Sequence, residues 1–324
     1  MSRVEQFVLG SGRGRAAIHV GLVNNMPDAA LRATELRFAR LLKDAAGPLD
    51  VRLRLFSLGG IARSDEMRAR MTGFYDDAAF LQASQLDALI FAGPGTDGDP
   101  RAETWWPELA HLVDWAEIGT ISALFSGQAG NAALLHLDGI LPRRLPAKKA
   151  GIYRSQRAED DPLFFGLKRE ALVPHERRSA IAQGDLGAHG YRVLARLEDG
   201  SADIFTREPA GHSRFVFLQG HPEYEPDALG RSYLAAMARF LAGESAQRPA
   251  VPENYFDRVT EQMLADLAAN APLARHAEIV STALPRQSWR DGSVRLFANW
   301  LALIAAAKTR RTASRAVHTR RRAS

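Results

Sequence analysis

Cysteine is absent from this chain of 324 residues. Its absence excludes disulfide bonds, thiolate metal ligands and a thiol nucleophile. No apolar run reaches the roughly 18 residues that a membrane-spanning helix needs, so we expect no membrane contact and a cytoplasmic location. The nine histidines show no tight metal-ligand spacing, and we therefore expect no metal site.

The glycine motifs that bind nucleotide phosphates are also missing. Glycines follow apolar runs at Gly93-Pro94-Gly95 and at Gly127-Gln128-Ala129-Gly130, but neither segment fits GxGxxG, and GxxxxGK[ST] does not occur. The sequence therefore argues against a nucleotide fold of the dehydrogenase or P-loop kind.

Acidic residues are missing from the end of the chain. Lys308 to Ser324 contains seven Lys and Arg residues and no acid. Because the formal net charge of the whole chain is +5, residues 1–307 have a net charge of −2. The surrounding Thr, Ser and Ala cannot build a core, so we expect a basic disordered tail at 308–324 behind a single domain at 1–307. No aromatic residue lies among these cations, which makes nucleic acid an unlikely partner.

Short apolar segments alternate with segments that repeat apolar residues at helical spacing. The first kind predicts strands at residues 16–23, 86–92 and 120–125, and the second predicts helices at 34–42, 106–115 and 132–137. Residues 50–56 alternate apolar with charged residues, which predicts a further strand. Strands that alternate with helices indicate a parallel sheet covered on both faces. The predicted fold is α/β, with a flavodoxin-like parallel sheet flanked by helices.

A second pattern begins near residue 150. Short strands are predicted at 191–197, 202–206 and 214–218, and Asp199-Gly200 between the first two is a hairpin-turn signal. We expect a small mixed or antiparallel extension here, followed by C-terminal helices at 227–241 and 293–308.

The strongest local signal is the segment that follows the last predicted strand. The apolar run Phe215–Leu218 ends at Gly220, and His221 and Glu223 follow two residues apart. A strand end that presents His-x-Glu is suited to a general base and the carboxylate that orients it. The alternative is a structural histidine bonded inside a turn; we favour the catalytic pair.

Several short motifs occur in the order found in one known family. These motifs are Asn24-Asn25-Met26-Pro27, Trp106-Pro107, Lys148 to Tyr153, Pro174-His175, Gly220-His221-Pro222-Glu223-Tyr224, Asn254-Tyr255-Phe256 and Ser288-Trp289-Arg290. With them the chain resembles the homoserine O-succinyltransferases and O-acetyltransferases of the class I glutamine amidotransferase-like fold. The resemblance implies acyl-CoA (succinyl-CoA or acetyl-CoA) as co-substrate, no bound cofactor, and acyl transfer through a cysteine to a hydroxyl that the His–Glu pair activates.

The chain departs from the family pattern at three positions. Matching the helix at Ala132-Ala133-Leu134 without gaps places Gly127 where the cysteine belongs. Glu176 replaces the serine that follows Pro-His, and Ala235 replaces an arginine that helps to hold the amino acid. Arg231, one helical turn before Ala235, is a possible substitute.

Ser126, one residue before Gly127, has three interpretations. It is a nucleophile with His221 as its base, a substrate-binding residue in a site that transfers the acyl group directly, or an ordinary strand-end serine. In each case the backbone N–H groups of the turn at Gly127 and Gln128 are candidates for an oxyanion hole at a helix N-terminus.

The resemblance also implies which residues bind the substrates. Lys148 and Arg177 are cations suited to phosphates or a carboxylate, although each has a basic neighbour that suggests a solvated surface. The full set of candidate substrate-binding residues is Asn25, Lys148, His175, Glu176, Arg177 and Arg231. We expect small-molecule substrates, and a homodimer built through the C-terminal helix.

Two classes of function follow from these observations. The first is an acyl-CoA-dependent O-acyltransferase that acts on L-homoserine or a similar hydroxylated amino acid, with the usual cysteine replaced at Ser126/Gly127. The second is a family member that has lost acyl transfer and binds ligands or regulates partners, or that performs a different step in specialised metabolism. Glutamine amidotransfer is disfavoured, because in this fold it needs the missing thiolate.

Overall fold

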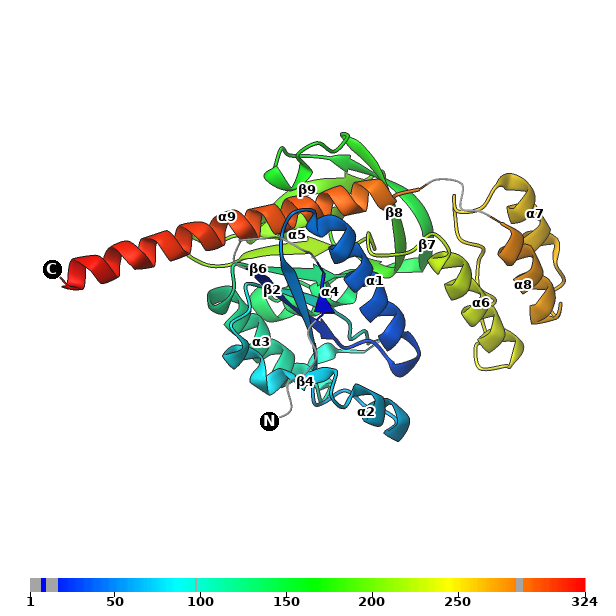
Figure 1. Cartoon of the computed structure of the whole chain (residues 1–324). Helices are drawn as coiled ribbons and strands as arrows, with labels where there is room; N and C mark the ends of the chain where they lie inside the picture. The colour runs from blue at the N-terminus through cyan, green and yellow to red at the C-terminus, as the bar shows by residue number, and fades with distance from the viewer. Residues whose placement is uncertain (1–6, 10–16, 97, 284–287, 324) are drawn as a thin grey trace.

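The computed structural model describes residues 7–9, 17–96, 98–283 and 288–323, with side chains as far as Ser314 (Figure 1). Its centre is a sheet whose parallel strands run in the order β3-β2-β5-β6-β11. Numbered along the chain, this order is 2-1-3-4-5, the flavodoxin-like arrangement. The predicted α/β fold is confirmed. The bounds of these strands are β2 Ile18–Asn24, β3 Val51–Ser57, β5 Ala88–Ala92, β6 Ser122–Ser126 and β11 Arg214–Leu218.

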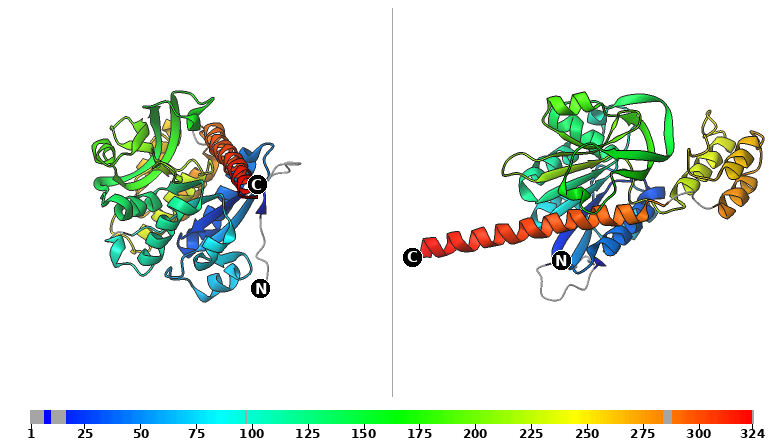
Figure 2. Two further views of the ribbon diagram at one scale, coloured as in Figure 1. Left: turned by 90° about the vertical axis from the view of Figure 1, so that its left-hand side faces the viewer. Right: turned by 90° about the horizontal axis from the view of Figure 1, so that it is seen from above.

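Helices cover both faces of this sheet (Figures 1 and 2). On one face, α1 (Asp28–Ala46) and α9 (Arg290–Ala323) pack over one half of the core. On the other face, α3 (Trp106–Gly119) and α4 (Gln128–Asp138) cover the other half. β5 and β6 are buried along their whole length, as the apolar runs of a sheet covered on both sides predict.

Aromatic rings link neighbouring strands beneath α3 and α4. Phe91 stacks on Phe125 at 4.8 Å between ring centroids, Phe125 on Phe217 at 4.9 Å, and Phe217 on Phe205 at 4.8 Å. These four residues come from β5, β6, β11 and β10, so the stack runs across the strands. Such cross-strand pairs stabilise a sheet beyond their burial alone.

Beyond β11 the sheet continues as an antiparallel extension in the order β10-β9-β7-β8. β9 (Arg192–Leu197) and β10 (Ala202–Arg207) form the expected hairpin, and Gly200 adopts the positive φ of +78° that its turn requires. The long strands β7 (Arg143–Arg157) and β8 (Glu170–Ala180) were not predicted, because their polar residues give no regular apolar alternation.

The remaining elements are short or lie at the margins of the sheet. They are β1 Phe7–Val8, α2 Asp65–Met71, β4 Tyr75–Asp77, η1 Ala78–Ser84, η2 Pro100–Ala102, η3 Pro162–Phe164, α5 Gln183–Ala188, α6 Ala228–Leu241, α7 Arg258–Asp266 and α8 Leu273–Thr282. α6, α7 and α8 group at the opposite end of the molecule from the C-terminus (Figure 1). None of the helices described is long and apolar enough to cross a membrane.

The sequence places a disordered tail from residue 308, whereas the structure continues α9 to Ala323. The reason is visible at the expected boundary: the Lys308 ammonium donates to the Ala17 carbonyl and to Asp87, both at 2.7 Å, and Arg311 donates to the Thr120 carbonyl at 3.0 Å. These contacts carry the helix past residue 307. Its last turns then extend away from the sheet (Figure 2).

Trp300 is the anchor of α9, and we predict a large loss of stability when it is truncated. Its ring is buried, and its indole N–H donates to the Ser122 hydroxyl at the start of β6, at 2.9 Å. Trp300→Ala should therefore lower the free energy of unfolding by about 3–5 kcal/mol, measured by denaturant unfolding. Arg310→Ala, on an exposed part of the same helix, should change it by no more than about 0.5 kcal/mol. Equal losses in the two variants would refute this role of Trp300.

Candidate functional site

The candidate site lies at the carboxyl edge of the sheet, where β6 and β11 end side by side. The two strands pair in parallel, with Leu218 opposite Ser126. The turn after Ser126 and the turn after Leu218 therefore leave the sheet at the same level. This register brings Gly127 next to His221, although the two are 94 positions apart in the chain.

His221 and Glu223 are paired as the sequence suggested. The imidazole Nδ1 lies 2.8 Å from Glu223 Oε1, and because the carboxylate only accepts, Nδ1 carries the donated hydrogen. Glu223 is buried, so its charge is shielded from water. The neutral ring is left with its other nitrogen, Nε2, free to accept a proton.

The Ser126 hydroxyl faces Glu223. Its hydroxyl donates to Glu223 Oε1 at 3.1 Å, and no hydrogen bond joins it to His221 in the described structure. Ser126 and His221 therefore bind the same carboxylate oxygen. This geometry argues against the first of the three interpretations and makes Ser126 a support for Glu223.

Gly127 occupies the sharp turn between β6 and α4. Its backbone has φ +56° and ψ −120°, the strained conformation of a strand-to-helix turn that holds a nucleophile in other enzymes. A Cβ placed on Gly127 would lie 2.9 Å from His221 Cε1 and 3.4 Å from Nε2. A side chain at residue 127 would therefore collide with the His221 ring, and glycine allows this ring to approach the turn closely.

The two backbone N–H groups proposed for an oxyanion hole differ in availability. The Gly127 N–H donates to the Leu218 carbonyl at 2.8 Å and is therefore committed to the sheet edge. Gln128 is the first residue of α4, where backbone N–H groups have no acceptor inside the helix. Its side chain packs against Gly95, where a Cβ would lie only 2.3 Å from Gln128 Oε1. Gln128 is thus the better donor.

Tyr224 follows the His221–Glu223 pair, and we assigned it no role from the sequence. Its ring stacks on the His221 imidazole, with 4.4 Å between centroids and 12° between planes. Its backbone carbonyl accepts from the Trp289 indole at 2.8 Å, which fixes the turn. The guanidinium carbon of Arg37, in α1, lies 4.6 Å from the centre of the same ring.

Glu176 and Lys148 come together beside Tyr224. Glu176 accepts from the Lys148 ammonium and the Ser232 hydroxyl through Oε1, and from the Tyr224 hydroxyl through Oε2 at 3.0 Å. Burial by itself would raise the pKa of Glu176, but the charge of Lys148 and these donors outweigh it and lower the pKa. The positive charge of Lys148 is therefore balanced by a carboxylate of the protein itself.

His175 lies beneath the catalytic turn and has no exposed surface. Its Nε2 lies 3.3 Å from Asp203 Oδ1, and Asp203 accepts hydrogen bonds from the Ser155 hydroxyl and from the Gly220 backbone N–H. A Cβ on Gly220 would approach the His175 ring to 2.9 Å. The expected substrate contact is therefore replaced by a supporting one, since His175 packs under the backbone that carries His221.

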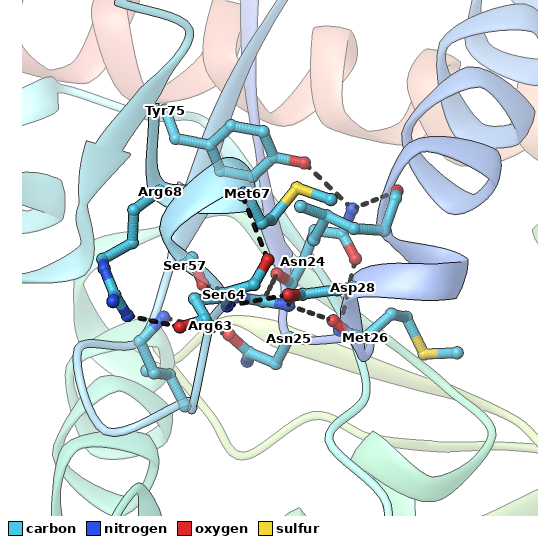
Figure 3. A network of polar contacts seen from close by, with 12 residues as sticks. Asn24, Asn25, Met26, Asp28, Ser57, Arg63, Ser64, Met67, Arg68 and Tyr75 are labelled. Atoms are coloured by element: carbon cyan, nitrogen blue, oxygen red, sulfur yellow. Dashed lines mark hydrogen bonds and ion pairs between the residues drawn. The ribbon is translucent and has the colours of Figure 1, made fainter. Parts of the chain in front are cut away.

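The other three expected substrate-binding residues are engaged by the protein itself. Asn25 is buried and its Oδ1 accepts from the Leu58 backbone N–H at 3.0 Å, which ties the loops after β2 and β3 together (Figure 3). Arg177 is buried and donates to the Ser179 carbonyl and the Ser201 hydroxyl, each at 2.9 Å. Arg231 pairs with Asp227 and, at 3.2 Å, with Glu225.

A cavity of about 210 Å³ opens next to the Gln128 turn. Among its lining residues are Thr96, Gln128, Asn131, Arg144 and Arg178. No carboxylate partner of Arg144 or Arg178 occurs in the parts of the chain that the structure describes. The cavity is thus suited to an anionic molecule. Within the same described residues, no three His, Asp or Glu side chains are grouped to hold a metal ion.

Comparison with known proteins shows the family of this chain. The family described as homoserine O-succinyltransferase matches residues 11–311. The chain belongs to the homoserine O-succinyltransferase family. The predicted family is thereby confirmed, and with it the assignment of the chain as an acyltransferase.

Named relatives of the homoserine O-succinyltransferase family match most of the chain. A homoserine O-succinyltransferase of Rhodopseudomonas palustris is 43% identical over 301 residues, which cover 89% of this chain and 88% of the relative. One of Methylorubrum extorquens is 42% identical over 298 residues, with 89% and 87% covered. Among solved structures, a glutamine amidotransferase of Thermotoga maritima has 11% identity and a TM-score of 0.49, with 82% of this chain and 99% of that chain covered.

We predict that His175 makes the fold sensitive to acid. Burial lowers the pKa of His175, so the folded chain keeps the imidazole neutral at a pH where the unfolded chain binds a proton. The free energy of unfolding should therefore fall as the pH drops below about 6.5, by at most about 1.4 kcal/mol per pH unit from this group. His175→Gln should show a shallower decline in denaturant titrations between pH 7 and pH 5.

The matched control for this prediction is His212→Gln, because His212 is exposed. That variant should keep the pH dependence of the unmodified chain. If His175→Gln keeps it too, the proposed contribution of His175 is wrong.

Proposed function

We propose that this chain transfers an acyl group from acyl-CoA directly to the hydroxyl of L-homoserine or a similar hydroxylated amino acid. The observation that carries the proposal is Gly127: it stands at the strand-to-helix turn without a side chain, and the His221 ring approaches it more closely than a side chain would allow. With no cysteine in the chain and with Ser126 bonded to Glu223, both substrates would have to meet in one complex. Membership of the homoserine O-succinyltransferase family supports the choice of acceptor.

The reaction then has one bond-exchange step. The acceptor hydroxyl oxygen attacks the thioester carbonyl carbon, and His221 Nε2 takes the hydroxyl proton as the new C–O bond forms. Glu223, bonded to Nδ1, stabilises the imidazolium that results. The C–S bond breaks, the proton passes to the departing thiolate, and the products are the O-acyl amino acid and free CoA.

The helix after the turn supports the charge that develops on the carbonyl oxygen. Gln128 opens α4, so its backbone N–H points out of the helix N-terminus at the positive end of the helix dipole. Gly127 allows the turn that places this N–H, because glycine adopts a φ of +56° readily, whereas a residue with a side chain would be strained there. A single preorganised donor of this kind is worth about 100- to 1,000-fold in rate in other acyl-transfer enzymes.

The neighbouring cavity is the proposed place for the acyl donor. It adjoins Gln128, so a thioester in the site could continue into it, and Arg144 and Arg178 would meet the CoA phosphates. Succinyl-CoA and acetyl-CoA share these phosphates, and both fit this role.

The absence of a side chain at Gly127 also favours a second candidate function. A family member without a nucleophile could bind homoserine or an acyl-CoA without turning either over, and then act as a regulator. The retained His221–Glu223 pair weighs against this alternative, because a binding protein has no use for a base with its own buried carboxylate.

Direct transfer predicts a distinct kinetic pattern. Initial rates measured against both substrates should give intersecting lines in double-reciprocal plots, as expected for a ternary complex, and intact-protein mass spectrometry with donor alone should find no acyl adduct. Parallel lines, or an adduct that maps to Ser126, would show a covalent intermediate and contradict direct transfer.

His221 and Ser126 should respond differently to mutation. His221→Ala should lower kcat by about 100- to 10,000-fold, because the proton acceptor is lost. Ser126→Ala should cost less than about 10-fold, because it removes only one of two hydrogen bonds to Glu223 Oε1. Product assays with L-homoserine and each acyl-CoA would measure both. The proposed roles fail if the order of the two effects is reversed.

A further inference from the structure

One arginine beside the His221–Glu223 turn has no carboxylate partner among the residues that the structure describes. Arg37 lies on α1, and its guanidinium is placed over the Tyr224 ring at 4.6 Å. Its Nε is buried without a hydrogen-bond partner, and no carboxylate of the described residues pairs with it. Leaving a partly buried guanidinium without an acceptor is costly, so the arrangement points to a ligand that supplies one.

The other cations near this turn differ from Arg37, because each of them forms an ion pair with a carboxylate of the protein. Arg40, three residues after Arg37 on α1, pairs with Glu225. Arg231 pairs with Glu225 and Asp227, and Lys148 pairs with Glu176. Arg231, which the sequence suggested as the replacement for the arginine missing at Ala235, is therefore not available to hold an anion.

The position of Arg37 suits one particular anion. The guanidinium carbon and the centre of the His221 ring lie 4.6 Å and 4.4 Å from the centre of the Tyr224 ring, so they are at most 9.0 Å apart. In a 2-amino acid with a 4-hydroxyl group, the carboxylate carbon and the hydroxyl oxygen are about 5 Å apart when extended. Adding a hydrogen bond of about 3 Å at each end spans the gap between the two side chains.

We propose that Arg37 binds the α-carboxylate of the acceptor amino acid and so determines which acceptors are used. This inference rests on the proposed acyl transfer. The carboxylate supplies the acceptor that the guanidinium lacks, and the amino acid is held with its hydroxyl toward His221. Stacking on Tyr224 keeps the guanidinium in place before the substrate arrives, which reduces the entropy lost on binding.

The test compares acceptors with and without a carboxylate. Arg37→Gln should raise KM for L-homoserine about 10- to 100-fold, the range expected for a lost charge-assisted hydrogen bond. It should leave KM for the acyl-CoA unchanged, and kcat/KM for 3-aminopropan-1-ol, which has the hydroxyl but no carboxylate, should change by less than about 3-fold. Arg37→Lys should recover part of the loss, because it restores the charge.

Arg40→Gln is the matched control, because it removes a neighbouring arginine that already has a carboxylate partner. It should keep the KM for L-homoserine, and thermal melting should show that both variants fold. The role of Arg37 would be overturned, and acyl transfer left intact, if Arg37→Gln kept the KM for L-homoserine. The same holds if the variant raised only the KM for succinyl-CoA. Absence of product from the unmodified chain with either donor would instead overturn the proposed function.

Discussion

The parallel pairing of β6 with β11 is the constraint on which the site depends. It sets the ends of two strands, far apart in the chain, at one level, and it does so inside a sheet whose central strands are wholly buried. The Phe125 and Phe217 rings stack across this pair at 4.9 Å, so core packing and register support each other. A shift of one residue would turn these rings to the opposite face and separate Gly127 from His221. The precision of the catalytic turn therefore derives from an apolar core several residues away.

The sequence was sufficient for the parts of the fold that are governed by burial. Strands such as Ala88–Ala92 are apolar throughout and were found from that pattern, whereas β3 was found from the alternation of its apolar residues with Arg52 and Arg54. It was insufficient for β7 and β8, where Arg143–Arg157 mixes charged and apolar residues because much of the strand is exposed. The end of the chain shows the same limit, since a composition typical of disorder gives no sign that Lys308 would reach Asp87 across the fold.

The site divides in a similar way. His221 and Glu223 could be recognised because they are two positions apart at a strand end, so local geometry alone brings them together. Residues whose roles depend on distant neighbours could not be assigned: Ser126 faces Glu223, and His175 meets Asp203 under the turn. Arg37 had no sequence signal at all, because a helical arginine looks the same with or without a counter-ion. Asp203, a carboxylate that lies next to apolar residues in the buried part of β10, was a signal that a closer look at the pattern could have found.

The glycine at position 127 has a consequence for how the protein would handle scarce metabolites. A nucleophilic residue can be acylated by the thioester while the acceptor is absent. Water can then hydrolyse the acyl-enzyme, and the activated donor is lost without product. This turn has no side chain on which such a group could wait. Consumption of the donor would then follow the joint availability of both small molecules, and the chain would waste none of it during shortage of the amino acid.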